Sequence, residues 1–149
     1  MTLLALVAGG IRYGLDVRQV EGVVPIPRLQ AVAMTPTWVA GVFPFFDRLV
    51  PVIDLCLLHG GQPAKPRLGT RVVVTRYPLP DGSVQALGLM AENVTDIVET
   101  RERPEPSGLA HGDAPWLEGL VDDGAADLVQ VMNPAELLTD EVRAVLFPR

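Results

Sequence analysis

The sequence is poor in the residues that build covalent and metal cross-links. Its 149 residues include one cysteine, Cys56, and two histidines, His59 and His111. A single cysteine excludes an internal disulfide framework and is typical of a reducing compartment. A zinc site needs three or four ligands, and the Cys and His residues alone barely reach that number. We therefore expect neither a metal ion nor another cofactor.

Basic residues and long apolar runs are also scarce. Lys and Arg number 12 against 18 Asp and Glu, which gives a net charge of −6, whereas nucleic-acid-binding domains carry a basic stripe. No apolar run approaches the roughly 20 residues that cross a bilayer. The short run Leu3–Ala8 has no Lys or Arg before it and leads into a turn, so it predicts a first strand and not a secretion signal. We expect a cytoplasmic protein without nucleic-acid binding or direct membrane insertion.

The most informative part of the sequence is the stretch from residue 41 to residue 55. Two apolar, β-prone runs flank Asp47-Arg48, which predicts a β-hairpin. Asp54 is expected to cap one helical turn over residues 55–59, which Gly60-Gly61 ends. This hairpin is the centre of the predicted fold.

The few aromatic residues, 5% of the chain, concentrate around this hairpin. Phe43 and Phe45 share one face of a strand, and we expect both in the core. Phe46 lies beside the turn, where burial is harder, and exposed aromatic residues often mark an interface. Trp38, just before the hairpin, is either a core residue or an anchor for a partner.

The rest of the chain predicts short strands joined by turns, with helix at the C-terminal end. Gly9-Gly10 is a two-residue hairpin signal, and Asn133-Pro134 begins a helix with a capping side chain and a proline at the first position. Asp16, Asp54 and Glu92 each follow a strand, and we expect them to cap short turns and not to act as a paired acid and base. The predicted strands outside the central hairpin are Leu3–Ala8, Ile11–Leu15, Val23–Ile26, Arg71–Arg76, Val84–Met90, Val94–Glu99, Leu117–Val121 and Asp127–Met132.

The two halves of the chain resemble each other. Trp38-Val39-Ala40-Gly41-Val42 matches Trp116-Leu117-Glu118-Gly119-Leu120, and Tyr13-Gly14-Leu15 matches Leu87-Gly88-Leu89. Short strands, few helices and a duplicated pattern predict two small β-barrels packed together. Residues 60–68 hold two Gly, two Pro and two cations, as linkers do. We place the boundary there, so that subdomain 1 covers about 11–65 plus the terminal segments and subdomain 2 about 66–135.

These motifs occur in an order that is similar to a known family. They are Tyr13-Gly14-Leu15-Asp16-Val17, Pro36 with Trp38, the stretch 41–55 ending in Pro-Val-Ile-Asp-Leu, Thr70–Val74 and Gly88–Val94. Together they resemble the chemotaxis coupling protein (CheW-like) family over nearly the whole chain. The resemblance implies a single CheW-like domain over 1–149. Its fold would be mostly β: two small five-stranded SH3-like β-barrel subdomains packed together, with short helical turns and a C-terminal helix.

The resemblance also implies a function and its partners. Members of the family are non-enzymatic adaptors that couple the cytoplasmic tips of chemoreceptors (methyl-accepting chemotaxis proteins) to the regulatory domain of a CheA-type histidine kinase. A cytoplasmic location at membrane receptor arrays follows. By resemblance, the kinase-facing region contains Val20, Gly22, Leu29 and Gly41, and the receptor-facing region contains Phe46, Val72 and Ile97.

The sequence departs from the family pattern at the hairpin tip. The family usually has Asn-x-Arg-Gly there, where this chain has Pro44-Phe45-Phe46-Asp47. A phenyl ring cannot replace the hydrogen bonds of a guanidinium. Gly22 also stands where an acidic residue is common. We interpret these changes as a sign of a divergent member, such as one serving a pathway for surface behaviour.

Two other functions stay open at the level of sequence. Cys56 and His59 have a Cys-x-x-His spacing that permits thiol chemistry, which leaves a small-ligand-binding or thiol-dependent enzyme domain as an alternative. Because Cys56 lies among leucines, burial as a small apolar residue is its expected state. The second alternative is an isolated CheW-like regulatory domain of a larger kinase.

Overall fold

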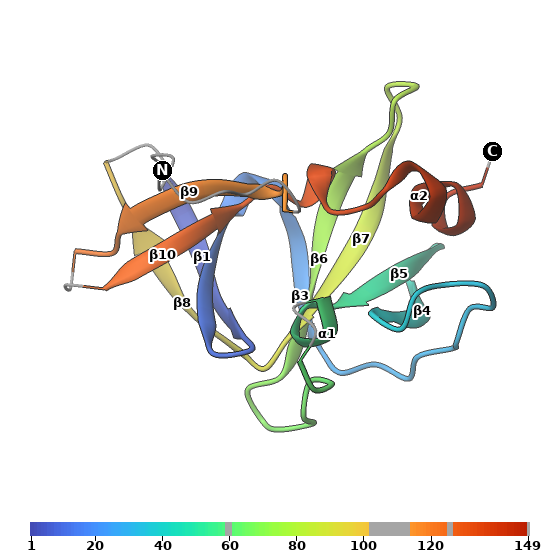
Figure 1. Ribbon diagram of the computed structural model, residues 1–149, viewed down its shortest axis with the longest axis horizontal. Helices are drawn as coiled ribbons and strands as arrows, with labels where there is room; N and C mark the ends of the chain where they lie inside the picture. Colours follow the sequence, from blue (N-terminus) through green and yellow to red (C-terminus); the bar gives the residue numbers. More distant parts are fainter. Residues whose placement is uncertain (59–60, 102–113, 125–126, 149) are drawn as a thin grey trace.

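The computed structural model describes residues 1–58, 61–101, 114–124 and 127–148, and most of them form strands. The described strands make two five-stranded sheets that lie next to each other along the long axis of the molecule (Figure 1). The first sheet contains β1 (Thr2–Ala8), β2 (Ile11–Asp16), β8 (Asn93–Glu99), β9 (Leu117–Asp122) and β10 (Leu128–Met132), in the order β8-β1-β2-β10-β9. The second contains β3 (Val20–Pro25), β4 (Val39–Phe45), β5 (Arg48–Asp54), β6 (Arg71–Pro78) and β7 (Val84–Ala91), in the order β3-β6-β7-β5-β4. The prediction of a mostly β fold with two five-stranded units is confirmed.

Tight turns join the hairpins. Gly9 and Gly10, with φ of 58° and 78°, connect β1 to β2 as predicted, since two positive φ angles match the twist of paired strands. The turn between β4 and β5 lies one position earlier than predicted. Arg48 is paired with Phe45 in the ladder, so the turn residues are Phe46 and Asp47.

The sequence repeat is also a structural repeat. The strands β8, β1, β2, β10 and β9 of the first sheet correspond in order to β3, β6, β7, β5 and β4 of the second, and each sheet has one parallel pair, β2–β10 or β7–β5. Gly41 and Gly119 have matching φ angles of 141° and 143°. The carbonyl oxygens of Trp38 and Trp116 each accept a backbone N–H from the end of the neighbouring strand, at 2.8 and 2.7 Å.

Each sheet nevertheless combines strands from both halves of the chain. The chain leaves the first sheet after β2 and returns to it after β7, so β1 and β2 pair with strands of the second half (Figure 1). The linker at 60–68 does not separate the sheets, because β5 before it and β6 after it both belong to the second sheet. The subdomains, predicted as about 11–65 plus the terminal segments and about 66–135, therefore do not coincide with the sheets. The repeat marks where the duplicated sequence unit ends, whereas the strands pair across the units.

The core has three parts. The largest joins the two sheets and includes Leu6 and Leu15 from the first and Leu87 and Leu89 from the second. A smaller cluster belongs to the strands of each sheet alone, around Val129 in the first and around residues 72 and 74 in the second. Because the largest cluster draws on both sheets, the two barrels are packed into one unit.

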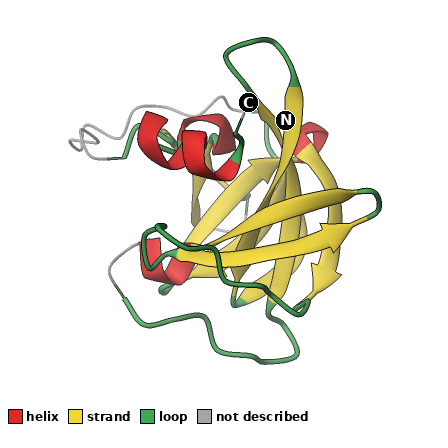
Figure 2. Ribbon diagram, turned by 90° about the vertical axis from the view of Figure 1, so that its right-hand side faces the viewer, coloured by secondary structure: helices red, strands yellow, loops and turns green. Residues whose placement is uncertain are grey.

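Short helices lie around the periphery of the strands (Figure 2). They are η1 (Val17–Gln19), α1 (Leu55–Leu58), η2 (Pro134–Glu136) and α2 (Asp140–Leu146). The predicted caps Asp16, Asp54 and Asn133 are confirmed, since each side chain accepts a backbone N–H of its helix. Glu92 caps no helix; its carboxylate contacts Cys56 and Lys65 instead. Within the described residues, no helix is long and apolar enough to cross a membrane.

Candidate protein-interaction surfaces

The tip of the β4–β5 hairpin presents an exposed aromatic side chain. Phe46 is 86% exposed and has φ of 53°, an unusual backbone conformation for a bulky residue. Its ring packs edge-on against Phe45 with ring centres 4.7 Å apart, and Phe45 packs against the buried Phe43 at 6.2 Å. A row of three rings thus runs from the core to the solvent. The expected burial holds for Phe43 and only in part for Phe45.

Side chains connect this tip to the edge strand β3. An added Cβ at Gly22 would lie 3.3 Å from Cζ of Phe45, so glycine makes room for the ring. Arg48 of β5 forms an ion pair with Glu21, which lies on β3 next to Gly22. β3 and β4 are the two edge strands of the second sheet. These contacts therefore connect β3 to the β4–β5 hairpin across the open side of the barrel.

The predicted kinase-facing residues gather around this barrel. Gly22 lies in β3, and the half-buried Leu29 packs against the core of the second sheet. Gly41 lies buried in β4, where an added Cβ would lie 2.5 Å from the carbonyl oxygen of Gln30. Val20 packs against the core that joins the two sheets. The structure therefore brings Gly22, Leu29 and Gly41 into one barrel, where the two glycines allow close packing.

The predicted receptor-facing residues do not form one surface. Phe46 lies at the tip of the second sheet, whereas Ile97, 60% exposed, lies on β8 at the edge of the first. Figure 1 shows β8 and the β4–β5 hairpin at opposite ends of the molecule. Val72 requires a correction, because its side chain is fully buried in the core of the second sheet and offers a partner no atoms to touch. Val72 is buried because β6 lies between β3 and β7 in the sheet, and its Val72 side chain faces the core.

Trp38 contributes to packing. It is half-buried and lies against the core that joins the sheets. Its carbonyl oxygen accepts the backbone N–H of Asp54. Trp38 thus holds the start of β4 beside the end of β5.

Cys56 does not have the surroundings of a reactive thiol. Its side chain is buried on α1, and burial raises the pKa of the thiol to about 11, with the Glu92 and Asp54 carboxylates adding to the rise. Such a thiol is protonated at neutral pH, whereas reactive cysteines are thiolates. His59 and His111 lie outside the described residues. The described part of the chain contains no group of three or more His, Cys, Asp or Glu side chains that could hold a metal ion.

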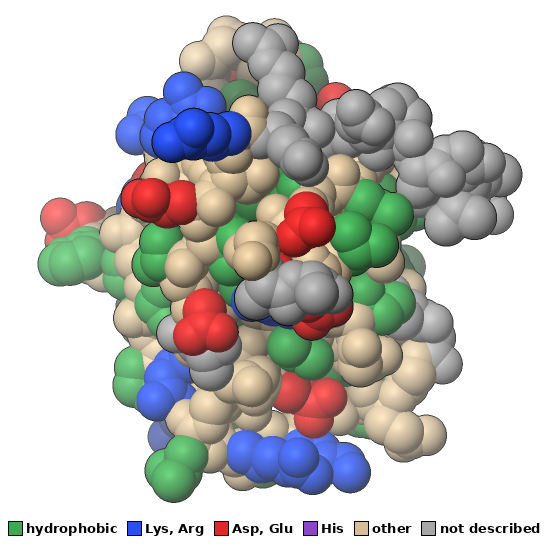
Figure 3. Space-filling model, turned by 90° about the vertical axis from the view of Figure 1, so that its left-hand side faces the viewer, with side chains coloured by type: hydrophobic (Ala, Val, Ile, Leu, Met, Phe, Trp, Pro, Cys, Tyr) green, Lys and Arg blue, Asp and Glu red, His purple; other side chains and the backbone are tan. Residues whose placement is uncertain are grey.

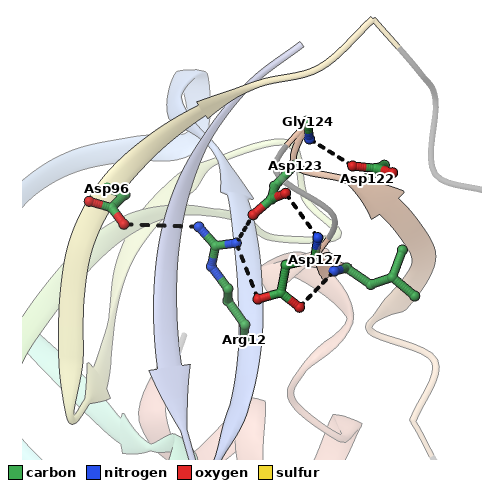
Figure 4. A network of polar contacts seen from close by, with 7 residues as sticks. Arg12, Asp96, Asp122, Asp123, Gly124 and Asp127 are labelled. Carbon is green, nitrogen blue, oxygen red and sulfur yellow. Dashed lines mark hydrogen bonds and ion pairs between the residues drawn. The ribbon is translucent and has the colours of Figure 1, made fainter.

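The first barrel also contains an ionic network that the sequence did not predict. The guanidinium of Arg12 on β2 forms an ion pair with Asp123 and lies 3.9 Å from Asp96 and 3.8 Å from Asp127 (Figure 4). It thereby connects β8 to the β9–β10 turn, as the Phe45 ring connects the edges of the other barrel. Figure 3, which faces this end of the molecule, shows acidic and basic side chains interspersed with apolar ones. No sequence pattern pointed to this network, because its members lie far apart along the chain.

The fold defines a small β protein of two packed five-stranded barrels, and its candidate sites are exposed surfaces. The CheW-like domain model matches residues 2–142. The chain belongs to the CheW-like family. Its fold is similar to the crystal structure of the scaffolding protein TtCheW from Thermoanaerobacter tengcongensis, with a TM-score of 0.77 and 21% identity over 95% of this chain and 89% of that one. Comparison with curated proteins finds no match.

Proposed function

We propose that this protein is a non-enzymatic adaptor that couples chemoreceptor cytoplasmic tips to a CheA-type histidine kinase, in the cytoplasm at membrane receptor arrays. The match of the CheW-like model to residues 2–142 carries the proposal. TtCheW, which shares the fold, is a scaffolding protein, and we extend that role to this chain.

Two features of the surface support an adaptor. The exposed tip of the second sheet and the exposed Ile97 of the first lie at opposite ends of the molecule, so a receptor bound at Ile97 would leave the second barrel free for the kinase. We assign the kinase to the barrel that contains Gly22, Leu29 and Gly41. We keep Phe46 and Ile97 as receptor contacts. Because Phe46 reaches Gly22 through Phe45, a receptor bound at the tip would adjoin the kinase-facing region.

The thiol-enzyme alternative has less support. It requires an accessible, ionisable Cys56, and this thiol is buried with a raised pKa. A positioned thiolate is the nucleophile in such enzymes.

Reconstitution tests the proposal. The purified protein is mixed with the regulatory domain of a CheA-type kinase and with a cytoplasmic receptor fragment, both from the same organism, and each binding is measured by calorimetry. Autophosphorylation of the full kinase is then measured with and without the adaptor. We expect binding to both partners and receptor-dependent kinase activity only when the adaptor is present. Absence of binding to both partners would overturn the proposal.

A further inference from the structure

A hollow at the end of β3 and β6 combines apolar and cationic side chains. It measures about 600 Å³ and is lined by Pro25, Ile26, Pro66, Arg67, Leu68, Thr70 and Arg71. Leu68 is 92% exposed, and the side chain of Ile26 is 38% exposed. Large apolar side chains that stay in water beside a concave surface often mark a binding site.

The loop that carries Leu68 is held by its own hydrogen bonds. The buried hydroxyl of Thr70 donates to the carbonyl oxygen of Lys65 at 2.5 Å and accepts the backbone N–H of Arg67 at 3.2 Å. The backbone N–H of Thr70 donates to the carbonyl oxygen of Arg67 at 3.1 Å. Leu68 is therefore presented by an ordered turn, which lowers the entropy cost of binding.

Arg71 is also oriented in advance. Its Nη1 donates to the carbonyl oxygens of Leu68 and Thr70, the second at 3.0 Å. These bonds leave the Nε–Nη2 edge of the guanidinium without a partner among the described residues. That edge presents two parallel N–H groups, the geometry that binds a carboxylate in a bidentate manner.

No described residue neutralises the charge of the hollow. Neither Arg67 nor Arg71 forms an ion pair with a described residue. The nearby carboxylate of Glu92 is already engaged. One of its oxygens accepts the backbone N–H of Lys65 on this loop, and the other accepts a hydrogen bond from the Cys56 thiol. The hollow beside α2 also contains an arginine, Arg143, but there Asp140 pairs with it. In a chain of net charge −6, two cations in one hollow that have no acidic partner among the described residues indicate a negative ligand.

We propose that this hollow docks an acidic, partly apolar peptide segment of a protein partner. One carboxylate of the segment binds the free edge of Arg71 and a second binds Arg67, while an apolar side chain packs against Leu68 and Ile26. A ligand with charge alone would leave both apolar side chains in water. The hollow lies on the barrel that we assign to the kinase, but its lining includes none of Gly22, Leu29 and Gly41. Binding of a peptide there does not depend on the receptor and kinase contacts proposed above.

A peptide titration tests the proposal. The probe is a synthetic peptide of alternating Glu and Leu, capped at both ends, added to the ¹⁵N-labelled protein. We expect amide shifts at Ile26 and residues 67–71. Arg67→Gln, whose side chain makes no contact that holds the turn, should weaken binding about tenfold or more, as should Arg71→Gln. Leu68→Ser should weaken it without a loss of thermal stability, because the side chain is exposed.

Arg76→Gln is the matched control. It removes the same charge from β6 at an exposed residue outside the hollow, and we expect affinity within about twofold of the wild type. An equal loss in Arg76→Gln would show unspecific charge attraction and overturn the site. So would equal binding of the peptide with Lys in place of Glu, shifts confined to other residues, or no binding up to about 1 mM. Sedimentation with phosphatidylglycerol vesicles without peptide binding would assign the hollow to lipid and overturn the peptide proposal.

Discussion

The ring of Phe45 covers Gly22, with its Cζ 3.3 Å from the position that a Cβ at residue 22 would take. This contact joins the two edge strands of the second barrel. At the equivalent side of the first barrel, Arg12 joins β8 to the β9–β10 turn through carboxylates. The duplicated halves thus close their barrels with different chemistry, one aromatic and one ionic.

Glycine-to-alanine substitutions compare the packing at this surface contact with the packing of the core. At Gly88 an added Cβ would lie 2.8 Å from Cγ1 of Val72 and 3.0 Å from Cγ2 of Val52, both buried. Gly88→Ala should lower the free energy of unfolding by about 1–3 kcal/mol, as overpacking of cores does. Gly22→Ala should change it by less than about 1 kcal/mol, since strand propensity favours alanine and the half-buried Phe45 can shift. Urea unfolding of both variants checks this, and an equal cost would show that Phe45 is as fixed as the core.

Arg12 should stabilise the first barrel measurably. The side chain of Asp123 is only 8% exposed and pairs with Arg12, whose own side chain is 23% exposed. Arg12→Gln should therefore lower the free energy of unfolding by about 1–3 kcal/mol, the range for hydrogen bonds to charged groups. The loss should shrink in high salt, which screens the remaining carboxylates from each other.

Arg18→Gln is the control for this ion pair. Arg18 pairs with Asp16, but its side chain is 84% exposed, so its removal should cost less than about 1 kcal/mol. The double variant Arg12→Gln with Asp123→Asn should recover part of the stability, because the buried charge is removed with its partner. A cost for Arg12→Gln no larger than that for Arg18→Gln would contradict a structural role of the network.

The raised pKa of Cys56 predicts a stability change in alkaline solution. Burial raises the pKa of the thiol from 9.0 to about 11, so the folded protein binds this proton more tightly than the unfolded chain. Between pH 9 and 11 the unfolded chain loses the proton first, and the free energy of unfolding falls as pH rises, by up to about 1.4 kcal/mol per pH unit from this group. Cys56→Ala should remove that part of the slope. Urea unfolding at pH 8 and pH 10 measures it, and identical slopes in both proteins would refute the prediction.

The sequence predicted the local elements well because their signals are local. Gly9-Gly10, the caps Asp16 and Asp54, and the exposed position of Phe46 each depend on a few neighbouring residues. The repeat also predicted two similar barrels. Pairing across the halves could not be read from it, because a repeat shows which strands are equivalent and not which of them become neighbours.

The candidate site was harder to predict than the fold. Val72 was placed at a surface by resemblance, yet its exposure depends on β6 being central in the sheet. Arg12 meets Asp123 only through the fold, since 111 positions separate them in sequence. Leu49, which begins the apolar run of β5, is 70% exposed and pairs with Pro44 on β4, so an apolar run in the sequence does not by itself predict burial.

Substitutions at Phe46 should affect binding without affecting the stability of the fold. Its φ of 53° costs a bulky residue of the order of 1 kcal/mol, which glycine avoids. Phe46→Gly and Phe46→Ala should thus leave the thermal melting temperature nearly unchanged or, for glycine, slightly higher. Leu128→Ala, which truncates a 56% exposed side chain of the first sheet, is the control. If Phe46→Ala unfolds the protein, the ring belongs to the core and the interface proposal fails.

Binding at the same position should respond strongly. If Phe46 anchors the receptor, the truncation Phe46→Ala should weaken the complex by about 2 kcal/mol or more, roughly 30-fold in affinity, while Leu128→Ala leaves it unchanged. A receptor built for the family's usual Arg presents a carboxylate or carbonyl, which the phenyl ring leaves without a hydrogen bond. Phe46→Arg should therefore weaken binding to the cognate receptor and strengthen binding to a receptor from a system whose adaptor carries Arg. Parallel calorimetric titrations with both receptor fragments measure the exchange. Equal affinities of wild type and Phe46→Arg for both receptors would show that the tip does not select between them, since a ring and a guanidinium cannot satisfy the same pocket equally.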